Sequence, residues 1–190
     1  LAGKLDWHNW QGIAVQGLSD FAARLNQSKN EQYFVANINH LPEQVLIPLC
    51  AALENQTLPL SIIDAIIEKF THSTNNNLLQ QHLLRALASS CEHPHVTNMI
   101  DNLLAEHQPN DDLLIVISSR CWLALQTSNL LMIFLEKLVT AKETCLFNAI
   151  FKDLIAIPTI RPILFKCMRE PNRSQALARA IGQLFNQLGA

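Results

Sequence analysis

Three side chains that could bind a metal or act in catalysis lie close together near the middle of the chain. Cys91, His93 and His95 form a Cys-x-His-x-His pattern in an expected loop that opens a helix at Pro94. A thiolate and two imidazoles are good zinc ligands, and a fourth ligand from a neighbouring helix would complete a tetrahedral site. The spacing differs from the common zinc modules, which use two separated pairs of ligands. We therefore expect a connecting loop with Cys91 buried, and we expect no bound metal and no cofactor.

Nucleophilic catalysis would require Cys91 to face a base such as His93, with donors for an oxyanion close by. Their order in the sequence does not place the two side chains opposite each other. The five glycines form neither a Walker loop nor a dinucleotide-binding turn. Asp111 and Asp112 are the most evident acidic pair, and they suit the first turn of a helix. We expect a protein that is not an enzyme.

Basic residues are concentrated towards the end of the chain. Residues 1–110 contain 5 basic and 10 acidic side chains, and residues 111–190 contain 9 and 6, so the two parts carry −5 and +3. We expect an acidic protein partner, or head-to-tail self-association, with an ordinary solvated surface as the alternative. The residues expected to bind the partner are Arg161, Lys166, Arg169 and Arg173.

The whole chain has a net charge of −2 and an isoelectric point of about 6.4. Such a chain has no general attraction for phosphate backbones or anionic membranes, so nucleic acid is not the expected partner. The longest uncharged stretch, residues 121–135, is too short to cross a bilayer. Five widely spaced cysteines are typical of reduced core thiols, which predicts a cytoplasmic protein without disulfides.

Helical periodicity recurs along almost the whole chain, with prolines and short polar runs between the periodic segments. Residues 113–117 could be a short buried strand, but the residues around them favour a helix. The sequence therefore predicts an all-α fold. The expected helices cover residues 10–26, 30–37, 42–54, 59–70, 78–89, 94–106, 111–125, 129–139, 142–155, 160–170 and 174–188.

From residue 42 onward these helices pair into hairpins that repeat about every 31 to 36 residues. The second helices carry apolar residues at positions i, i+3, i+4 and i+7, a stripe that one hairpin alone could not bury. The residues expected to be buried by this stacking are Ile67, Met99, Ile100, Leu103, Phe134, Leu135 and Leu138. In period and pattern the chain resembles HEAT-like and armadillo-like α-solenoids, and an irregular helical bundle is the alternative. It is also similar to an uncharacterised family of bacterial proteins.

We expect a single domain over residues 1–190, in which residues 1–41 cap about four and a half hairpins formed by residues 42–190. Because the first residue is Leu1, we expect a longer parent protein. Stacked hairpins and scarce charge favour a noncatalytic scaffold for protein binding, or a regulatory domain. The alternative is a HEAT-like enzyme resembling the bacterial alkylpurine DNA glycosylases, although the overall charge does not supply the basic cleft that such enzymes use.

Overall fold

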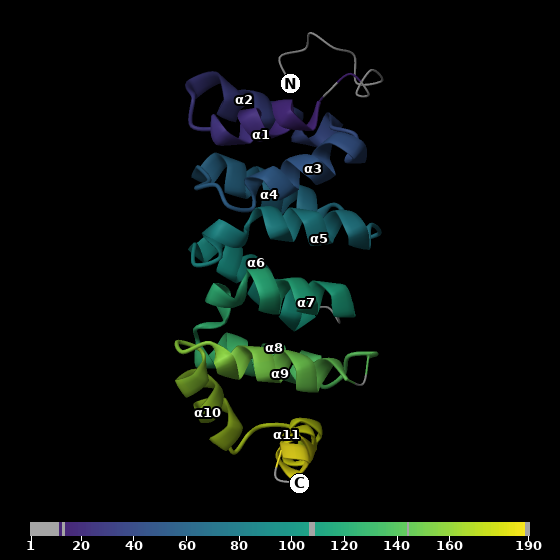
Figure 1. Cartoon of the computed structure of the whole chain (residues 1–190), viewed down its shortest axis with the longest axis vertical. Coiled ribbons are helices and arrows are strands. Elements are labelled where there is room, and N and C mark those ends of the chain that lie inside the picture. The colour runs from purple at the N-terminus through teal and green to yellow at the C-terminus, as the bar shows by residue number, and fades with distance from the viewer. Residues whose placement is uncertain (1–11, 13, 107–108, 144, 189–190) are drawn as a thin grey trace. The chain divides into compact units, whose positions relative to one another are not determined.

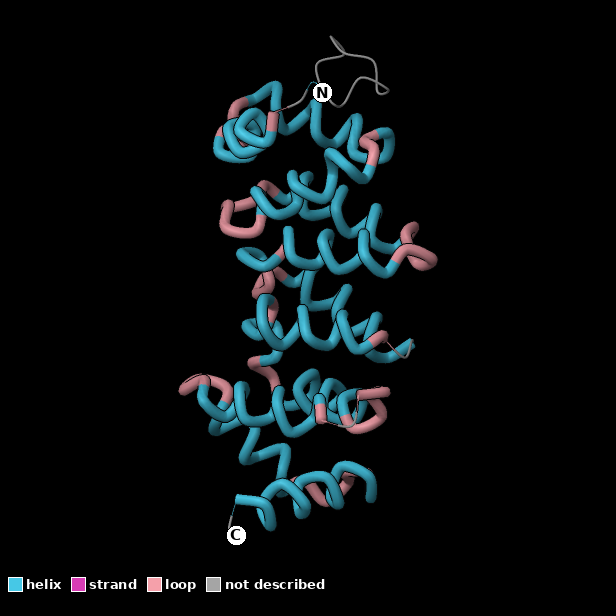
Figure 2. The backbone as a smooth tube through the Cα atoms, turned by 45° about the vertical axis from the view of Figure 1, so that its right-hand side comes forward, coloured by secondary structure: helices cyan, strands magenta, loops and turns pink. Residues whose placement is uncertain are grey.

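The described part of the chain is helical throughout its regular structure. The computed structural model describes residue 12 and residues 14–106, 109–143 and 145–188. Within these residues the regular elements are helices, and no strand occurs (Figure 2). The predicted all-α fold is therefore confirmed. The α-helices are α1 (Val15–Ala23), α2 (Ser28–Asn37), α3 (Glu43–Leu53), α4 (Leu60–Thr71), α5 (Asn77–Ala86), α6 (Pro94–Glu106), α7 (Asp111–Arg120), α8 (Ser128–Leu138), α9 (Leu146–Ala156), α10 (Arg161–Arg169) and α11 (Gln175–Leu188).

The helices begin where capping residues and prolines occur in the sequence. Asn76, Asn110 and Thr127 each accept a hydrogen bond in the first turn of the helix that follows. Pro42 and Pro59 are the N-cap residues of α3 and α4. A backbone N–H at these positions would have no partner within the helix, so proline is well tolerated there.

The expected helix over residues 78–89 ends at Ala86, and a separate 3₁₀ turn, η3 (Ala88–Ser90), follows it. Two further expected helices differ from the observed ones for local reasons. Residues 111–125 form α7 and then a separate 3₁₀ turn, η4 (Trp122–Leu125), because Cys121 leaves the helical region with φ −113° and ψ 22°. Helix α9 begins at Leu146 instead of residue 142. The backbone N–H groups of Lys142 and Glu143 donate to the carboxylate of Asp111, at 3.1 and 2.8 Å, and this holds the segment outside the helix.

The chain forms two compact units, Leu1–Val96 and Thr97–Ala190, with the boundary inside α6. In the first unit, α3 packs against α1 and α5, while α2 packs against α4 (Figure 1). In the second unit, α7 packs against α9, and α8 packs against α10. Alternate helices are thus neighbours within each unit, as expected of stacked hairpins. The expectation of a single domain stays a prediction.

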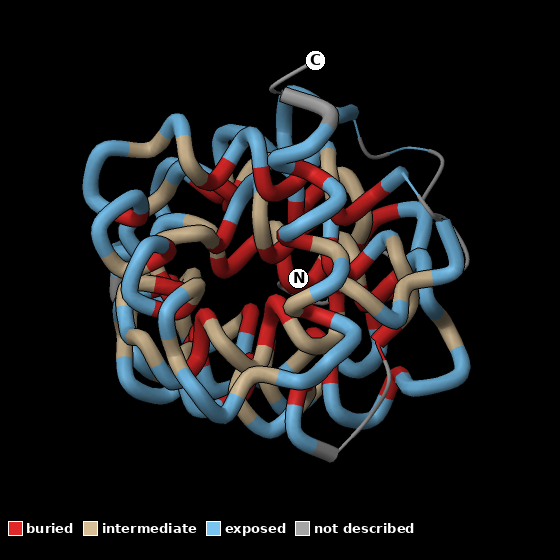
Figure 3. Tube along the Cα trace, turned by 90° about the horizontal axis from the view of Figure 1, so that it is seen from below, coloured by how far each residue is buried: buried red, intermediate tan, exposed pale blue. Residues whose placement is uncertain are grey.

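The apolar stripes form the core of each unit, and Figure 3 marks the buried positions in red. Met99, Ile100, Phe134, Leu135 and Leu138 are buried, as expected. Two further assignments were wrong, because Ile67 and Leu103 are only half-buried. Their neighbours Ile66 and Leu104 are fully buried, so each helix keeps its core-facing stripe but covers this one position with the adjacent residue.

Four of the five cysteines are buried, and Cys145 is exposed. Core packing therefore accounts for most of the thiols, as the apolar neighbours of these cysteines predict. Within the described residues, every helix is too short or too polar to cross a membrane.

Candidate partner-binding site on helix α10

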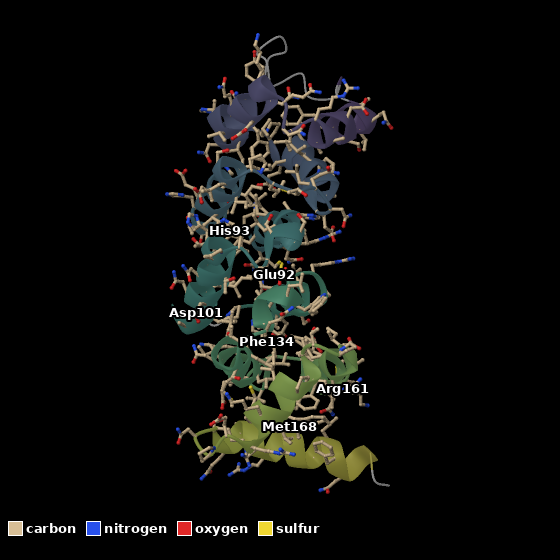
Figure 4. All side chains as sticks on the ribbon, turned by 90° about the vertical axis from the view of Figure 1, so that its left-hand side faces the viewer. Glu92, His93, Asp101, Phe134, Arg161 and Met168 are labelled. Carbon is tan, nitrogen blue, oxygen red and sulfur yellow. The ribbon has the colours of Figure 1, made fainter. Side chains whose placement is uncertain are left out.

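The Cys-x-His-x-His segment begins between α5 and α6, where Figure 4 labels His93, and ends at His95 in the first turn of α6. Cys91 is fully buried, and its thiol donates to the carbonyl oxygen of Leu87 at 3.4 Å. Nδ1 of His93 accepts the backbone N–H of His95 at 3.3 Å, whereas Nδ1 of His95 lies 2.6 Å from Oδ1 of Asp64. Each side chain thus has its own partner. The described residues contain no group of three or more His, Cys, Asp or Glu side chains that could hold a metal ion.

Many acidic side chains are engaged in bonds between successive hairpins. Six carboxylates in the described part of the chain contact residues 30 to 38 positions later, and in every pair the carboxylate belongs to the earlier element. Four of the ten acidic residues in residues 1–110 are used in this way. The acidic excess there is therefore not simply a free acidic surface. The pairs are Glu31 with Ser61, Glu43 with Asn76, Glu54 with Arg85, Asp64 with His95, Asp111 with the backbone N–H of Glu143, and Glu136 with Ser174.

The most buried of these pairs joins α3 to α5. Nη2 of Arg85 lies 2.7 Å from Oε2 of Glu54, and the two side chains are 32% and 9% exposed. Burial and the nearby Arg85 guanidinium lower the pKa of His82, while Glu54 acts in the opposite direction. Nδ1 of His82 is buried without a hydrogen-bond partner among the described residues.

Cys50 lies in the same region of the first unit, but it is a poor nucleophile. It is fully buried, and burial raises the pKa of its thiol to about 12. The thiolate is the reactive form of cysteine, so a thiol with this pKa is almost entirely unreactive near neutral pH. The Arg85 guanidinium lowers the pKa of Cys50, but burial has the larger effect. We assign the cluster of Cys50, Glu54, His82 and Arg85 to the packing of α3 on α5.

Helix α10 holds three of the four expected partner-binding residues. Arg161 and Met168, both labelled in Figure 4, are its first and next-to-last residues. Leu164 and Cys167 are buried where α10 packs on α8 and α9. The thiol of Cys167 donates to the carbonyl oxygen of Ser128 at 3.4 Å, which ties α10 to the first residue of α8. These contacts determine which face of α10 is exposed.

Two of the four basic residues bind nearby backbone carbonyl groups. Nε of Arg161 donates to the carbonyl oxygen of Ile155 at 2.7 Å, in the last turn of α9. Nη1 of Arg173 donates to the carbonyl oxygen of Glu170 at 2.9 Å, just after α10. A cation at the end of a helix interacts favourably with the last carbonyl groups. Arg161 and Arg173 therefore help to hold the ends of α9 and α10.

Lys166 and Arg169 are the remaining two, and they form an exposed surface with Phe165. Both cations are exposed and make no hydrogen bond or ion pair with a described residue. Phe165 is 38% exposed, and it lies one residue before Lys166 and four before Arg169. At helical spacing, these three residues share the side opposite Leu164 and Cys167. We call Phe165, Lys166 and Arg169 the α10 face.

Sequence reasoning found the two cations of this face through the charge count but missed Phe165. The sequence signal that could have revealed Phe165 is the apolar pair Leu164 and Cys167, three residues apart. Burial of this pair directs Phe165 away from the core. The α10 face thus combines two positive charges with exposed aromatic area, a combination suited to a partner that is acidic and partly apolar.

Comparison with protein families finds one model, described as "Protein of unknown function (DUF3549)", which matches residues 1–185. Comparison with curated proteins and with solved structures finds no match. The expected similarity to an uncharacterised family is confirmed in this general sense. The resemblance to HEAT-like and armadillo-like repeats is not tested by these comparisons and stays a prediction.

Proposed function

Since the chain belongs to the family described as "Protein of unknown function (DUF3549)", we propose a function from its own surface, that of a noncatalytic helical scaffold for protein binding. The proposed contact is an acidic segment of another protein on the α10 face. The observation that carries the proposal is the exposure of Lys166 and Arg169 beside Phe165, without acidic partners among the described residues.

The distribution of acidic residues supports this proposal. Six carboxylates elsewhere in the described part of the chain bind residues of the following hairpin, whereas the two cations of the α10 face have no such partner within the described residues. Glu170 is the acidic residue adjacent in sequence to this face, and it is half-buried. An incoming carboxylate would therefore meet two cations that do not already share a carboxylate within the protein.

The strength expected of such a contact is modest. Each exposed ion pair contributes about 0 to 1 kcal/mol, so two pairs alone would not hold a partner. Burial of the exposed part of Phe165 would add an apolar contribution. Positive charge would act mainly by accelerating association, and this effect weakens as salt screens the charges.

The stacked helices of the second unit would present this face on a rigid support. We propose that they serve as HEAT-like and armadillo-like repeats do, by offering an extended surface to a partner. In a longer protein, the same surface would suit a regulatory domain that binds a catalytic region.

Affinity purification with the tagged chain, followed by mass spectrometry, tests the proposal. The key variant combines Lys166→Glu and Arg169→Glu, and the matched control is Lys152→Glu on the exposed side of α9. We expect an acidic protein that the parent and the control retain and the double variant loses, with unchanged circular dichroism. Equal capture by all three proteins would contradict the proposal. Tight binding of duplex DNA at about 150 mM salt would favour the nucleic-acid alternative.

A further inference from the structure

The second unit contains a half-open cleft whose lining combines apolar side chains with one acid and one base. Its volume is about 280 Å³, and it lies where the end of α8, the beginning of α9 and the first half of α11 meet. Leu138 and Phe147 line it as buried residues, and Ala176 and Ala180 contribute small side chains from α11. These alanines limit how far α11 fills the space.

The acid and the base are Glu143 and Arg179, both exposed. The backbone N–H of Glu143 donates to Oδ2 of Asp111 at 2.8 Å, which holds this segment in place. Nη2 of Arg179 makes a long hydrogen bond of 3.3 Å to Oε1 of Gln175, one helical turn earlier. A guanidinium has five N–H donors, so this bond leaves others for a ligand.

We propose that this cleft binds a free apolar α-amino acid of about the size of leucine. The apolar side chain would pack on Leu138 and Phe147, the α-ammonium would face Glu143, and the α-carboxylate would face Arg179. A single net charge on the ligand would leave one of these two rim charges unmatched. Glu143 and Arg179 form the rim of the cleft, and Leu138 and Phe147 form its floor. A zwitterion with an apolar side chain is complementary to both charges of the rim and to the apolar floor.

The size of the cleft agrees with this class of ligand. Sites for drug-sized molecules have volumes of roughly 300 to 1,000 Å³, and this cleft lies just below that range. The half-open shape allows entry from solvent.

The cleft is separate from the α10 face. Cys167 of α10 contacts Ser128 at the beginning of α8, whereas the cleft is lined by Leu138 at the end of the same helix. The amino-acid site therefore does not depend on the proposed binding of a protein partner. Either proposal can fail without the other.

Titration of the ¹⁵N-labelled chain with L-leucine, followed by amide chemical shifts, tests the proposal. Isocaproate, which is leucine without the amino group, and isoamylamine, which is leucine without the carboxylate, serve as matched ligands. We expect L-leucine to shift the amides of Ala176 and Ala180 with a dissociation constant of about 0.1 to 10 mM, since so small a ligand makes few contacts. The absence of saturable shifts up to about 20 mM would overturn the proposal.

Two variants connect each rim residue to one group of the ligand. Glu143→Gln should weaken L-leucine and isoamylamine by about tenfold and leave isocaproate unchanged, because isocaproate has no ammonium. Arg179→Gln should weaken L-leucine and isocaproate to a similar extent and leave isoamylamine unchanged. Lys152→Gln is the control and should alter none of the three. Binding of all three ligands that is insensitive to both rim variants would overturn the proposal in favour of a merely apolar cleft.

Discussion

Replacing Glu54 by Gln removes the carboxylate from the most buried ion pair between successive hairpins. The side chain keeps its size and one oxygen that can accept from Arg85, but the negative charge on the group that accepts from Nε at 3.2 Å and from Nη2 at 2.7 Å is lost. Glu54 is only 8% exposed, so water cannot easily replace its carboxylate as a partner. The variant therefore leaves a partly buried guanidinium without its counter-charge.

The expected loss of stability follows from the exposure of the two side chains. Breaking a fully buried ion pair costs about 3 to 5 kcal/mol, because the remaining charge is unpaired and poorly hydrated. The Arg85 side chain is 32% exposed, so its guanidinium can recover part of its hydration. We therefore expect Glu54→Gln to lower the free energy of unfolding by about 1 to 3 kcal/mol. Glu68→Gln makes the same change at an exposed residue of α4 and should change stability by less than about 0.5 kcal/mol.

Urea unfolding followed by far-UV circular dichroism measures this loss, and amide hydrogen exchange in α3 and α5 assigns it to the first unit. The double variant Glu54→Gln with Arg85→Gln completes a thermodynamic cycle. We expect it to be less destabilised than the sum of the two single variants, because both remove the same ion pair. Additive effects, or a Glu54→Gln variant as stable as Glu68→Gln, would refute the role assigned to this pair.

Three further variants test local features of the two units. Burial lowers the pKa of His82 in the folded protein, so below about pH 6.5 the unfolded chain binds more protons than the folded one and the free energy of unfolding decreases as the pH falls. His82→Gln should reduce this pH dependence in urea unfolding measured at pH 5 and pH 7. Leu104→Ala should lower the free energy of unfolding by about 2 to 5 kcal/mol and Leu103→Ala by about 1 kcal/mol in thermal unfolding, since only Leu104 is fully buried. Equal losses for the two variants would show that the assigned core-facing side of α6 is wrong. The carboxylate of Glu136 accepts from the backbone N–H and the hydroxyl of Ser174, just before α11. Glu136→Gln should weaken this acceptor and speed amide hydrogen exchange in the first turn of α11. Unchanged exchange would argue against this carboxylate as a helix cap.

The positions of the helices were largely predictable because their signals are local. Proline at the first position and apolar residues at helical spacing predict residues 94–106, which are the bounds of α6. The break at Cys121 was not predictable, since apolar residues continue across it. The choice between Leu103 and Leu104 was also ambiguous, because either leucine continues a helical stripe.

Contacts between hairpins were beyond sequence reasoning for a different reason. Asp64 and His95 are 31 residues apart, and nothing near either residue indicates the other as its partner. The roles of the individual basic residues were also not predictable from the sequence. A charge count treats Arg161 and Lys166 alike, but Arg161 binds the carbonyl oxygen of Ile155 and Lys166 does not. That difference depends on where the backbone of α9 ends.

The most direct test of the proposed function is the association rate of the chain with an acidic partner isolated by affinity purification, measured at low and at physiological salt. For Lys166→Glu with Arg169→Glu we predict association at least about tenfold slower than for the parent at low salt, a smaller difference at about 150 mM salt, and a melting temperature close to that of the parent. An association rate that is unchanged by this double reversal at low salt would contradict the assignment of the α10 face as the partner-binding site.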